Sequence, residues 1–273
     1  MKYDSVMKKY LIPILVLLTL TSCATSPTGR TQLLIYPEEV AIASSLQAYQ
    51  QVIGPLGEKG KIDTDPLIKD RVVRITSRIV AQAVRMRPET GNWDWEIKVI
   101  DDPETVNAWA MAGGKMAVYS GLVKKLQPTD DELAQVIGHE ISHALARHSA
   151  EKMSMATVSQ AGVAAVAAMT DNDQVTMTGT TLLAAVAVTL PNSRTMESEA
   201  DRIGIELAAK AGYNPQAAVS LWKKMASAGA KNPPQFLSTH PSPANRQEVL
   251  SQLVPEMMPY YQEKGARPSY PLK

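Results

Sequence analysis

The chain has 273 residues, 45% of them hydrophobic and 20% charged, which excludes a disordered protein and supports a folded domain with its own core. The formal net charge is +1, so nothing favours nucleic acid as a partner. The single cysteine excludes a disulfide within the chain and a thiolate-rich zinc site, so any zinc must be held by nitrogen and oxygen.

Residues 1–22 have the organisation of a lipoprotein signal peptide. Lys8 and Lys9 precede an apolar run from Leu11 to Leu20, which is too short to span a bilayer as a permanent anchor. The following residues up to Cys23 resemble the bacterial lipobox, in which the cysteine is lipidated and becomes the first residue of the mature protein. The alternatives are an uncleaved signal anchor and a plain signal peptide with an incidental cysteine.

Residues 23–34 are rich in serine, threonine, proline and glycine, and we expect a tether that carries the lipid on Cys23. Ala24 follows the cysteine. By resemblance to the sorting rules of Gram-negative bacteria, this residue predicts an outer-membrane protein that faces the periplasm.

Residues 35–258 are expected to form the main domain, followed by a C-terminal tail over residues 259–273. Pro37 to Val52 is predicted to be helical, and Gly54 to Asp63 a loop. Asp65 and Pro66 then cap a longer helix, whose apolar residues recur at helical spacing and predict core contacts.

The pattern changes from Trp93, where alternating residues predict a strand that ends at Asp101. Two further short strands, Val106 to Ala112 and Lys115 to Ser120, are predicted around the turn Gly113-Gly114. A free strand edge beside a metal-binding helix is a place where an extended peptide can add as one more strand. An ordinary hairpin is equally consistent with the pattern.

The motif Gly138-His139-Glu140-Ile141-Ser142-His143 lies on a predicted helix, which begins at the capping box Thr129-Asp130-Asp131-Glu132. His139 and His143 share one helical face, so both imidazoles can bind a single ion. Glu140 can reach a water on that ion without being a ligand. The motif therefore predicts two zinc ligands and a general base, although histidine pairs at this spacing also occur on solvated helices.

His148 lies five residues beyond His143. If the helix continues, His148 lies about 140° around it from His143 and cannot share the ion. We interpret His148 as a surface residue or one that supports the ligands from outside. Residues 156–190 follow as an alanine-rich insert with two apolar runs, each too short to cross a membrane. We expect a helical lid over the site; an apolar surface that contacts lipid or substrate is the alternative.

The residues Pro191 to Arg194 are predicted to open a further helix, with Asn192 or Ser193 as its cap. Glu197 and Asp201 share one of its faces. Glu197 can complete a zinc site of two histidines and one glutamate, and Asp201 can accept the free ring N–H of a ligating histidine. Carboxylates at this spacing also occur on solvated helices. The pair indicates a metal site because His139 and His143 are present in the same chain.

The stretches HEISH and ESEAD, together with NAWAMAGGKMAVYSGL and STHPSPANR, resemble the HtpX, Oma and CAAX-prenyl-protease family of zinc metalloendopeptidases. The resemblance covers roughly residues 35 to 255. It implies an α+β, zincin-like (gluzincin) fold that is mostly helical, with a small sheet beside the zinc helix. It also implies one zinc ion per chain and selects Glu197 over Glu199 as the ligand. The lipobox brings the chain closest to the outer-membrane lipoprotein members.

The family resemblance also implies that a histidine and an arginine near the C-terminus approach the metal, which here are His240 and Arg246. His240 can stabilise the oxyanion or occupy the open zinc position, and Arg246 can pair with an acidic group of the site. A helix capped by Ser242, with Pro243 at its first position, is expected to follow His240. The alternative is a loop histidine and a surface arginine without a role.

These features predict a zinc metalloendopeptidase that degrades misfolded or unassembled envelope proteins. The predicted partners are unfolded protein substrates and the membrane, through the lipid on Cys23. An aminopeptidase with the same zinc core, and a lipid-anchored chaperone or assembly factor with a shielded zinc site, are the alternatives. The sequence makes no prediction about the oligomeric state.

Overall fold

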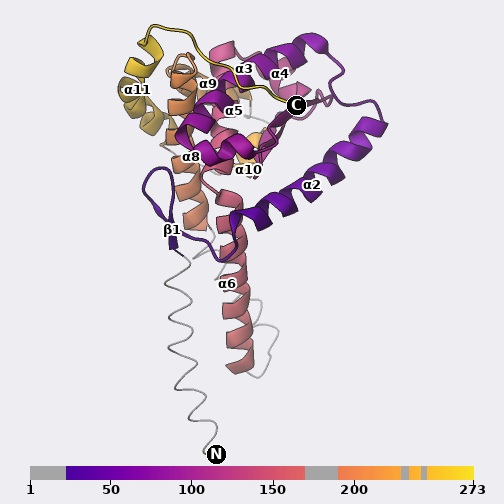
Figure 1. Ribbon diagram of the computed structural model, residues 1–273, viewed down its shortest axis with the longest axis vertical. Helices are drawn as coiled ribbons and strands as arrows, with labels where there is room; N and C mark the ends of the chain where they lie inside the picture. Colours follow the sequence, from indigo (N-terminus) through magenta and orange to yellow (C-terminus); the bar gives the residue numbers. More distant parts are fainter. Residues whose placement is uncertain (1–22, 170–189, 229–233, 241–244) are drawn as a thin grey trace, which may run out of the picture.

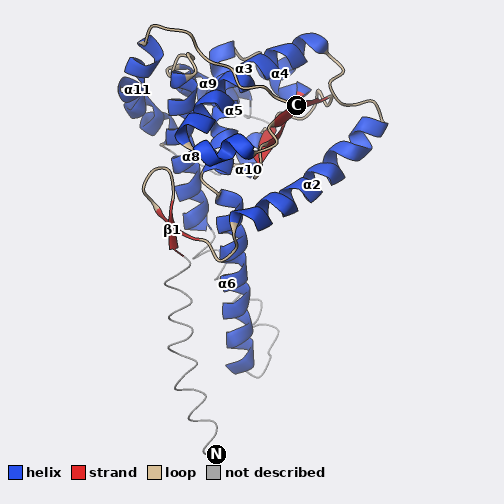
Figure 2. Cartoon of the chain, viewed as in Figure 1, coloured by secondary structure: helices blue, strands red, loops and turns tan. Residues whose placement is uncertain are grey.

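The computed structural model describes residues 23–169, 190–228, 234–240 and 245–273. Helices pack around a small sheet at one side of the body (Figures 1 and 2). The elements in chain order are β1 Cys23–Thr25, β2 Thr31–Leu33, α2 Glu38–Glu58, α3 Pro66–Met86, the 3-10 helix η1 Pro88–Asn92, β3 Glu96–Ile100, β4 Ala108–Met111, β5 Lys115–Tyr119, α4 Ser120–Leu126, α5 Asp130–Leu145, α6 His148–Met169, α8 Leu190–Lys210, α9 Ala217–Ala228, α10 Gln235–Thr239 and α11 Arg246–Gln262. The expectation of a mostly helical chain with a small sheet is confirmed.

Helix α5 is the centre of the body, and every residue from Glu132 to Leu145 on it is buried. It packs against α3, α8, α9 and strand β4. The predicted capping box is present, because the Thr129 side chain accepts from the Glu132 N–H while the Glu132 carboxylate accepts from the Thr129 N–H. The capping box therefore fixes the residue at which the helix begins.

The sheet has the strand order β3-β5-β4, with β3 parallel and β4 antiparallel to β5. Gly113 and Gly114 form the predicted turn between β4 and β5, with φ of +85° and +86°, a region that favours glycine. Strand β4 lies at the sheet edge and packs against α5. The expected edge strand beside the histidine helix is therefore present.

Helix α2 is longer than predicted. The sequence predicts a loop from Gly54 onward, whereas the helix extends to Glu58. The helix continues through Pro55 and ends in a Schellman motif, in which Gly60 has φ +62° and the Lys61 N–H donates to the Leu56 carbonyl. The stop signal is therefore Gly60 rather than Gly54. The predicted cap of α3 is correct, since the Asp65 carboxylate accepts from the backbone N–H groups of its first turn.

Residues 23–34, expected as a tether, form a β-hairpin of β1 and β2. Ser26 and Gln32 of this hairpin are buried. Their side chains donate hydrogen bonds to Glu199 of α8 and Glu151 of α6, so part of the polar composition connects the hairpin to the body.

The alanine-rich insert is described only in part. Its first apolar run lies on α6, which extends away from the body (Figure 1), and residues 170–189 lie outside the described part. The lid over residues 156–190 therefore stays a prediction. In the ranges the structure covers, no helix combines the length and apolar character needed to cross a bilayer.

One predicted helix start differs from the structure, and the residues of another lie outside the described part. Helix α8 already begins at Leu190, so Pro191 to Arg194 lie within it. Helix α11 begins at Arg246 after Asn245, while the expected cap Ser242 and Pro243 lie outside the described residues. Beyond α11 the chain returns across the body, where the Lys273 N–H donates to the Trp95 carbonyl.

Candidate metal centre

Three helices bring four side chains to one buried point. His139 and His143 come from α5, Glu197 from α8, and His240 from the end of α10. The Nε2 atoms of His139 and His143 lie 3.1 Å apart. The Glu197 Oε2 atom is 3.2 Å from the first of these nitrogens, and its Oε1 atom is 3.4 Å from the second. The predicted set of two histidines and one glutamate is therefore assembled.

These distances fit a tetrahedral ion. Zinc bonds to nitrogen and oxygen of about 2.0–2.1 Å place neighbouring ligand atoms about 3.4 Å apart. The three separations here, 3.1, 3.2 and 3.4 Å, are close to that value. Two imidazoles and a carboxylate are also a donor set that suits zinc. The cluster can therefore hold a metal ion.

Asp201 lies behind His139, as the sequence predicted. Its Oδ1 atom is 3.0 Å from His139 Nδ1, so the Nδ1–H donates to the carboxylate and the Nε2 lone pair points at the cluster. Burial lowers the pKa of His139, but hydrogen bonds to Asp201 and Glu197 outweigh it and raise the pKa to about 9. Because a protonated imidazole cannot ligate, protons and metal compete at this nitrogen.

Arg246 is buried and reaches the same carboxylate. Its guanidinium donates to Asp201 and lies 3.5 Å above the ring centroid of Trp222. Its NH1 atom is 3.8 Å from Glu197 Oε2. The arginine thus places a positive charge beside Asp201 and near Glu197 of the cluster, which agrees with the expectation that it pairs with an acidic group of the site.

Glu140 is buried next to the cluster without belonging to it. Its Oε1 atom is 3.3 Å from His240 Nε2. Burial raises the pKa of this carboxyl, which suits a group that takes up a proton during a reaction. Glu140 also lies on the helix that packs against the edge strand β4.

His240 contacts the other residues of the cluster, so the alternative of a loop histidine without a role does not fit its position. Its Nδ1 atom is 3.2 Å from His139 Nε2 and 3.2 Å from both oxygens of Glu197. Its ring stacks on Phe236 with the centroids 4.5 Å apart. The imidazole thus lies where a fourth ligand or a water would approach the ion.

His148 is not a surface residue: it is 1% exposed, and its Nδ1 atom is 2.8 Å from His143 Nδ1. His148 does not belong to the four-residue cluster, as expected, and of the two predicted roles support of a ligand from outside fits its position. The premise of a continuous helix is wrong, because α5 ends at Leu145. Arg147, with φ +56°, then turns the chain, so that His148 begins a new helix and faces back toward α5. Nothing in the local sequence marks this break, since neither glycine nor proline is present there.

Glu199 points away from the cluster, as the choice of Glu197 as ligand requires. It contacts His148, Ser26, Thr28 and Arg30 instead. Burial raises the pKa of Glu199, but these hydrogen bonds outweigh it and lower the pKa to about 2. Cys23, the predicted lipidation residue, begins the hairpin that carries these contacts.

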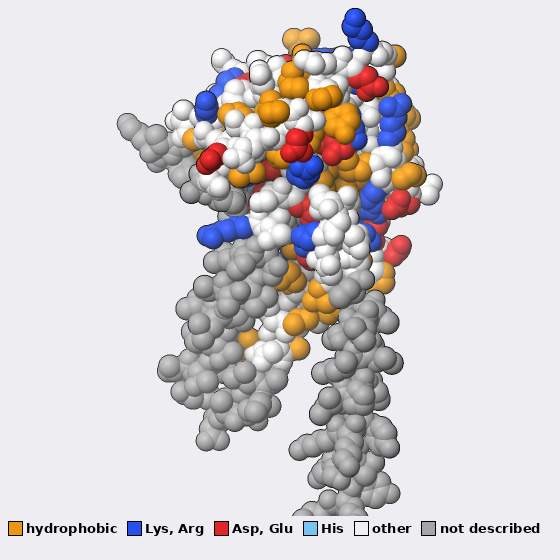
Figure 3. Space-filling model, turned by 90° about the vertical axis from the view of Figure 1, so that its left-hand side faces the viewer, with side chains coloured by type: hydrophobic (Ala, Val, Ile, Leu, Met, Phe, Trp, Pro, Cys, Tyr) orange, Lys and Arg blue, Asp and Glu red, His pale blue; other side chains and the backbone are white. Residues whose placement is uncertain are grey.

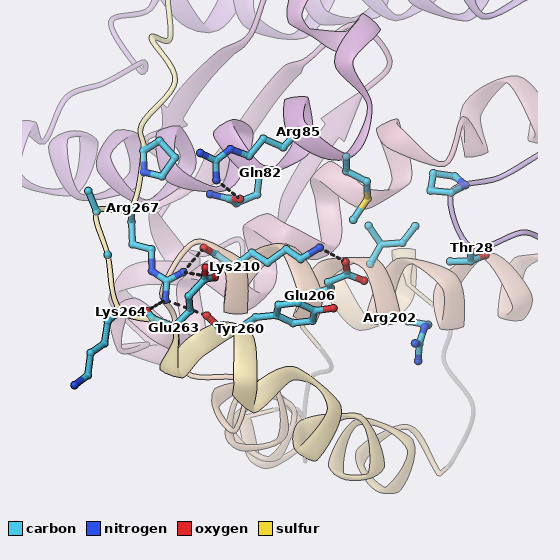
Figure 4. Close-up of a pocket in the computed structure, with 16 residues that line it drawn as sticks. Thr28, Gln82, Arg85, Arg202, Glu206, Lys210, Tyr260, Glu263, Lys264 and Arg267 are labelled. Carbon is cyan, nitrogen blue, oxygen red and sulfur yellow. Dashed lines mark hydrogen bonds and ion pairs between the residues drawn. The ribbon is translucent and has the colours of Figure 1, made fainter.

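A separate cavity of about 640 Å³ lies between α3, α8, α11 and the hairpin (Figure 4). Its walls carry several basic side chains, and two of them make contacts within the protein. Arg267 donates to backbone carbonyls at the ends of α8 and α11, and Lys210 pairs with Glu206. None of the cluster residues lines this cavity, and we assign no chemistry to it. On the face shown in Figure 3, charged side chains of both signs mix with hydrophobic ones over the body.

The model of peptidase family M48 matches residues 66–254, which include the whole cluster. The chain therefore belongs to peptidase family M48. The expected membership in the HtpX, Oma and CAAX-prenyl-protease family of metalloendopeptidases is confirmed, and so is the zincin-like fold.

Individual relatives agree with this assignment. The mitochondrial metalloendopeptidase OMA1 of Arabidopsis thaliana is 32% identical over 204 residues, covering 74% of this chain and 41% of the relative. The mitochondrial metalloendopeptidase OMA1 of Bos taurus is 31% identical over 243 residues, covering 85% and 46%. The beta-barrel assembly-enhancing protease of Yersinia pestis is 31% identical over 205 residues, covering 72% and 41%. The chain thus spans about half the length of these relatives.

Proposed function

We propose that this chain is a zinc-dependent metalloendopeptidase whose ion is held by His139, His143 and Glu197. The observation that carries the proposal is the convergence of these three groups from two helices, with ligand atoms 3.1–3.4 Å apart. The names of the relatives, metalloendopeptidases and a protease, support an endopeptidase over the two alternatives considered from the sequence.

An ion bound there would lower the pKa of a bound water toward neutrality and polarise the scissile carbonyl. Glu140, buried beside the cluster, takes a proton from the attacking water and passes it to the leaving amine. Asp201 holds His139 in the tautomer that ligates. No residue of the site needs to form a covalent bond to the substrate.

The edge strand β4 is the proposed place for the substrate backbone. Its partner β5 occupies one side, and β4 packs against the helix that carries Glu140. An extended peptide that adds along the free edge would pass the cluster with its backbone hydrogen-bonded. Because folded proteins rarely offer an extended segment, this mode favours unfolded substrates.

We assign the activity to quality control of misfolded or unassembled envelope and outer-membrane proteins. The name of the bacterial relative, a beta-barrel assembly-enhancing protease, supports this assignment, as does the lipobox before Cys23. A lipid on Cys23 would anchor the protein to the outer membrane, facing the periplasm. His240, whose Nδ1 atom is 3.2 Å from two ligating groups, would restrain the activity by occupying the open position.

Glu140→Gln tests the mechanism. The variant should keep one zinc per chain, because Glu140 is not a ligand, and should cleave casein at least about 100-fold more slowly, because the general base is lost. Glu206→Gln is the matched control: it makes the same chemical change on α8, in a residue that pairs with Lys210 and lies outside the cluster. Undiminished cleavage by Glu140→Gln would exclude this mechanism.

The same preparations separate the alternatives. Cleavage of peptides with blocked amino termini excludes an aminopeptidase. If the Glu140→Gln protein binds unfolded outer-membrane proteins and fully restores function in cells, the chaperone alternative replaces the proteolytic one.

A further inference from the structure

The metal ligand His143 is held from behind by another histidine rather than by a carboxylate. Its Nδ1 atom is 2.8 Å from His148 Nδ1, and the Nε2 atom of His148 is 3.1 Å from Glu199 Oε2. All three side chains are buried. A line of contacts therefore runs from the cluster through His143 and His148 to Glu199.

The chemistry of these groups fixes the direction of each hydrogen bond. A carboxylate only accepts, so His148 must donate its Nε2–H to Glu199. A neutral imidazole has one donor and one acceptor, which leaves His148 Nδ1 as the acceptor for the Nδ1–H of His143. The Nε2 lone pair of His143 then points at Glu197 and His139, as a metal ligand requires.

The far end of this line is held by the hairpin. The Ser26 and Thr28 hydroxyls donate to Glu199 Oε1, and Arg30 Nε donates to Oε2 at 2.7 Å. Because both oxygens of Glu199 accept hydrogen bonds, the carboxylate keeps its charge and its orientation.

The two terminal nitrogens of the Arg30 guanidinium make a bidentate pair with the carboxylate of Glu151 on α6, with both distances 2.7 Å. Arg30 therefore joins the hairpin to α6 and α8 at once. A bidentate arginine fixes geometry in a way that a single contact does not.

We propose that His148 and Glu199 are positioning residues for the metal ligand His143, and that the β1–β2 hairpin, through Arg30, is a structural part of the metal centre. The proposal rests on the function proposed above in one respect, that His143 ligates zinc. It adds residues beyond the four of the cluster, and it links the metal centre to the segment that begins at Cys23.

Two substitutions of His148 test the first half. His148→Leu keeps most of the volume and removes the acceptor, while His148→Asn places an amide oxygen near the former Nδ1. Zinc affinity, measured by competition with a chromophoric chelator, should fall about 10- to 100-fold in His148→Leu and recover most of this loss in His148→Asn. The absorption spectrum of the cobalt-substituted protein should change in the same order, which a loss of stability alone would not produce.

Arg30→Met tests the hairpin. We expect a smaller loss of zinc affinity than in His148→Leu, because Ser26 and Thr28 still contact Glu199. Arg71→Met is the matched control, since Arg71 has a similar exposure and also pairs with a carboxylate, Asp130, away from the metal centre. It should leave zinc affinity unchanged.

Equal zinc affinity in wild type and His148→Leu would overturn the proposal, and so would equal losses in the Leu and Asn variants. Equal losses of zinc affinity in Arg30→Met and Arg71→Met would show that the hairpin is not part of the metal centre. The proposed function fails separately: in that case the wild-type protein itself binds no zinc, or binds it and cleaves nothing.

Discussion

Gly138 and Gly204 lie backbone to backbone where α8 crosses α5. A Cβ atom on Gly138 would lie 2.7 Å from the Gly204 carbonyl oxygen, and one on Gly204 would lie 2.8 Å from the backbone nitrogen of His139. Both distances are too short for carbon, so only glycine allows this approach. The crossing lies next to His139, the first proposed metal ligand, and its closeness brings Glu197 on α8 within reach of the two histidines.

Gly204→Ala should therefore damage both the fold and the metal centre. The added methyl group meets backbone atoms of α5, which cannot rotate away, and overpacking of this kind costs about 1–3 kcal/mol. We expect a lower free energy of unfolding in denaturant and a weaker zinc affinity, because α8 must move away from α5. Gly162→Ala on α6, where nothing lies within 4 Å, is the control and should be neutral or stabilising by up to about 1 kcal/mol. Equal stability of the two variants would contradict this account.

His240→Ala should raise the rate of casein cleavage while zinc content stays at one per chain. The imidazole lies at the fourth position of the cluster, so its removal opens that position to water and substrate. If His240 instead stabilises the oxyanion, the same variant should be slower by about 10²–10³-fold. The direction of the change decides between the two roles.

Glu132→Gln should remove a pH-dependent part of the stability. Burial raises the pKa of Glu132, but hydrogen bonds from Lys224 and Ser220 outweigh it and hold the pKa below its ordinary value of 4.5. A lowered pKa in the folded state stabilises above pH 4.5, and this contribution is lost as the pH falls through the folded-state value. At pH 7 the variant should be less stable by about 1–2 kcal/mol.

The difference between wild type and Glu132→Gln should then shrink as the pH is lowered below 4.5, in denaturant unfolding of zinc-stripped protein. Glu256→Gln changes an exposed carboxylate on α11 and should shift stability by less than about 0.5 kcal/mol at either pH. A difference that does not depend on pH would show that Glu132 acts through shape alone.

Cys23→Ala should abolish the incorporation of labelled fatty acid and remove the protein from the outer-membrane fraction, because the thiol is the proposed acylation site. Ser22→Ala is the matched control. It keeps a small residue before the cysteine, so lipidation should persist. Labelled fatty acid on the Cys23→Ala protein would rule out Cys23 as the anchor.

The core of the metal centre could be predicted because its signals are periodic. His139 and His143 share a helical face by their spacing, as do Glu197 and Asp201, and the family resemblance selects Glu197 over Glu199. The capping box at Thr129 fixes the start of the first helix. The turn at Gly113 and Gly114 was equally readable, since glycine is the residue that accepts its backbone angles.

The rest depends on contacts between distant residues. The position of His148 follows from a chain reversal at Arg147, a residue that seldom adopts positive φ, and only tertiary packing selects it. The hairpin is polar and short, and the bonds that order it join Arg30 to residues 121 and 169 positions away. No local pattern encodes such pairings, which is why the sequence predicted a tether there.

An ordered hairpin also sets how far the active site can be from the bilayer. Cys23 itself pairs with Leu33 in the hairpin, and Ser26, about 10 Å of extended chain further on, already contacts Glu199, so a lipid on Cys23 would be attached directly to an ordered segment. With so short a connection, the enzyme could not reach substrates in the periplasm far from the membrane. Its targets would be polypeptides that linger within one protein diameter of the membrane surface.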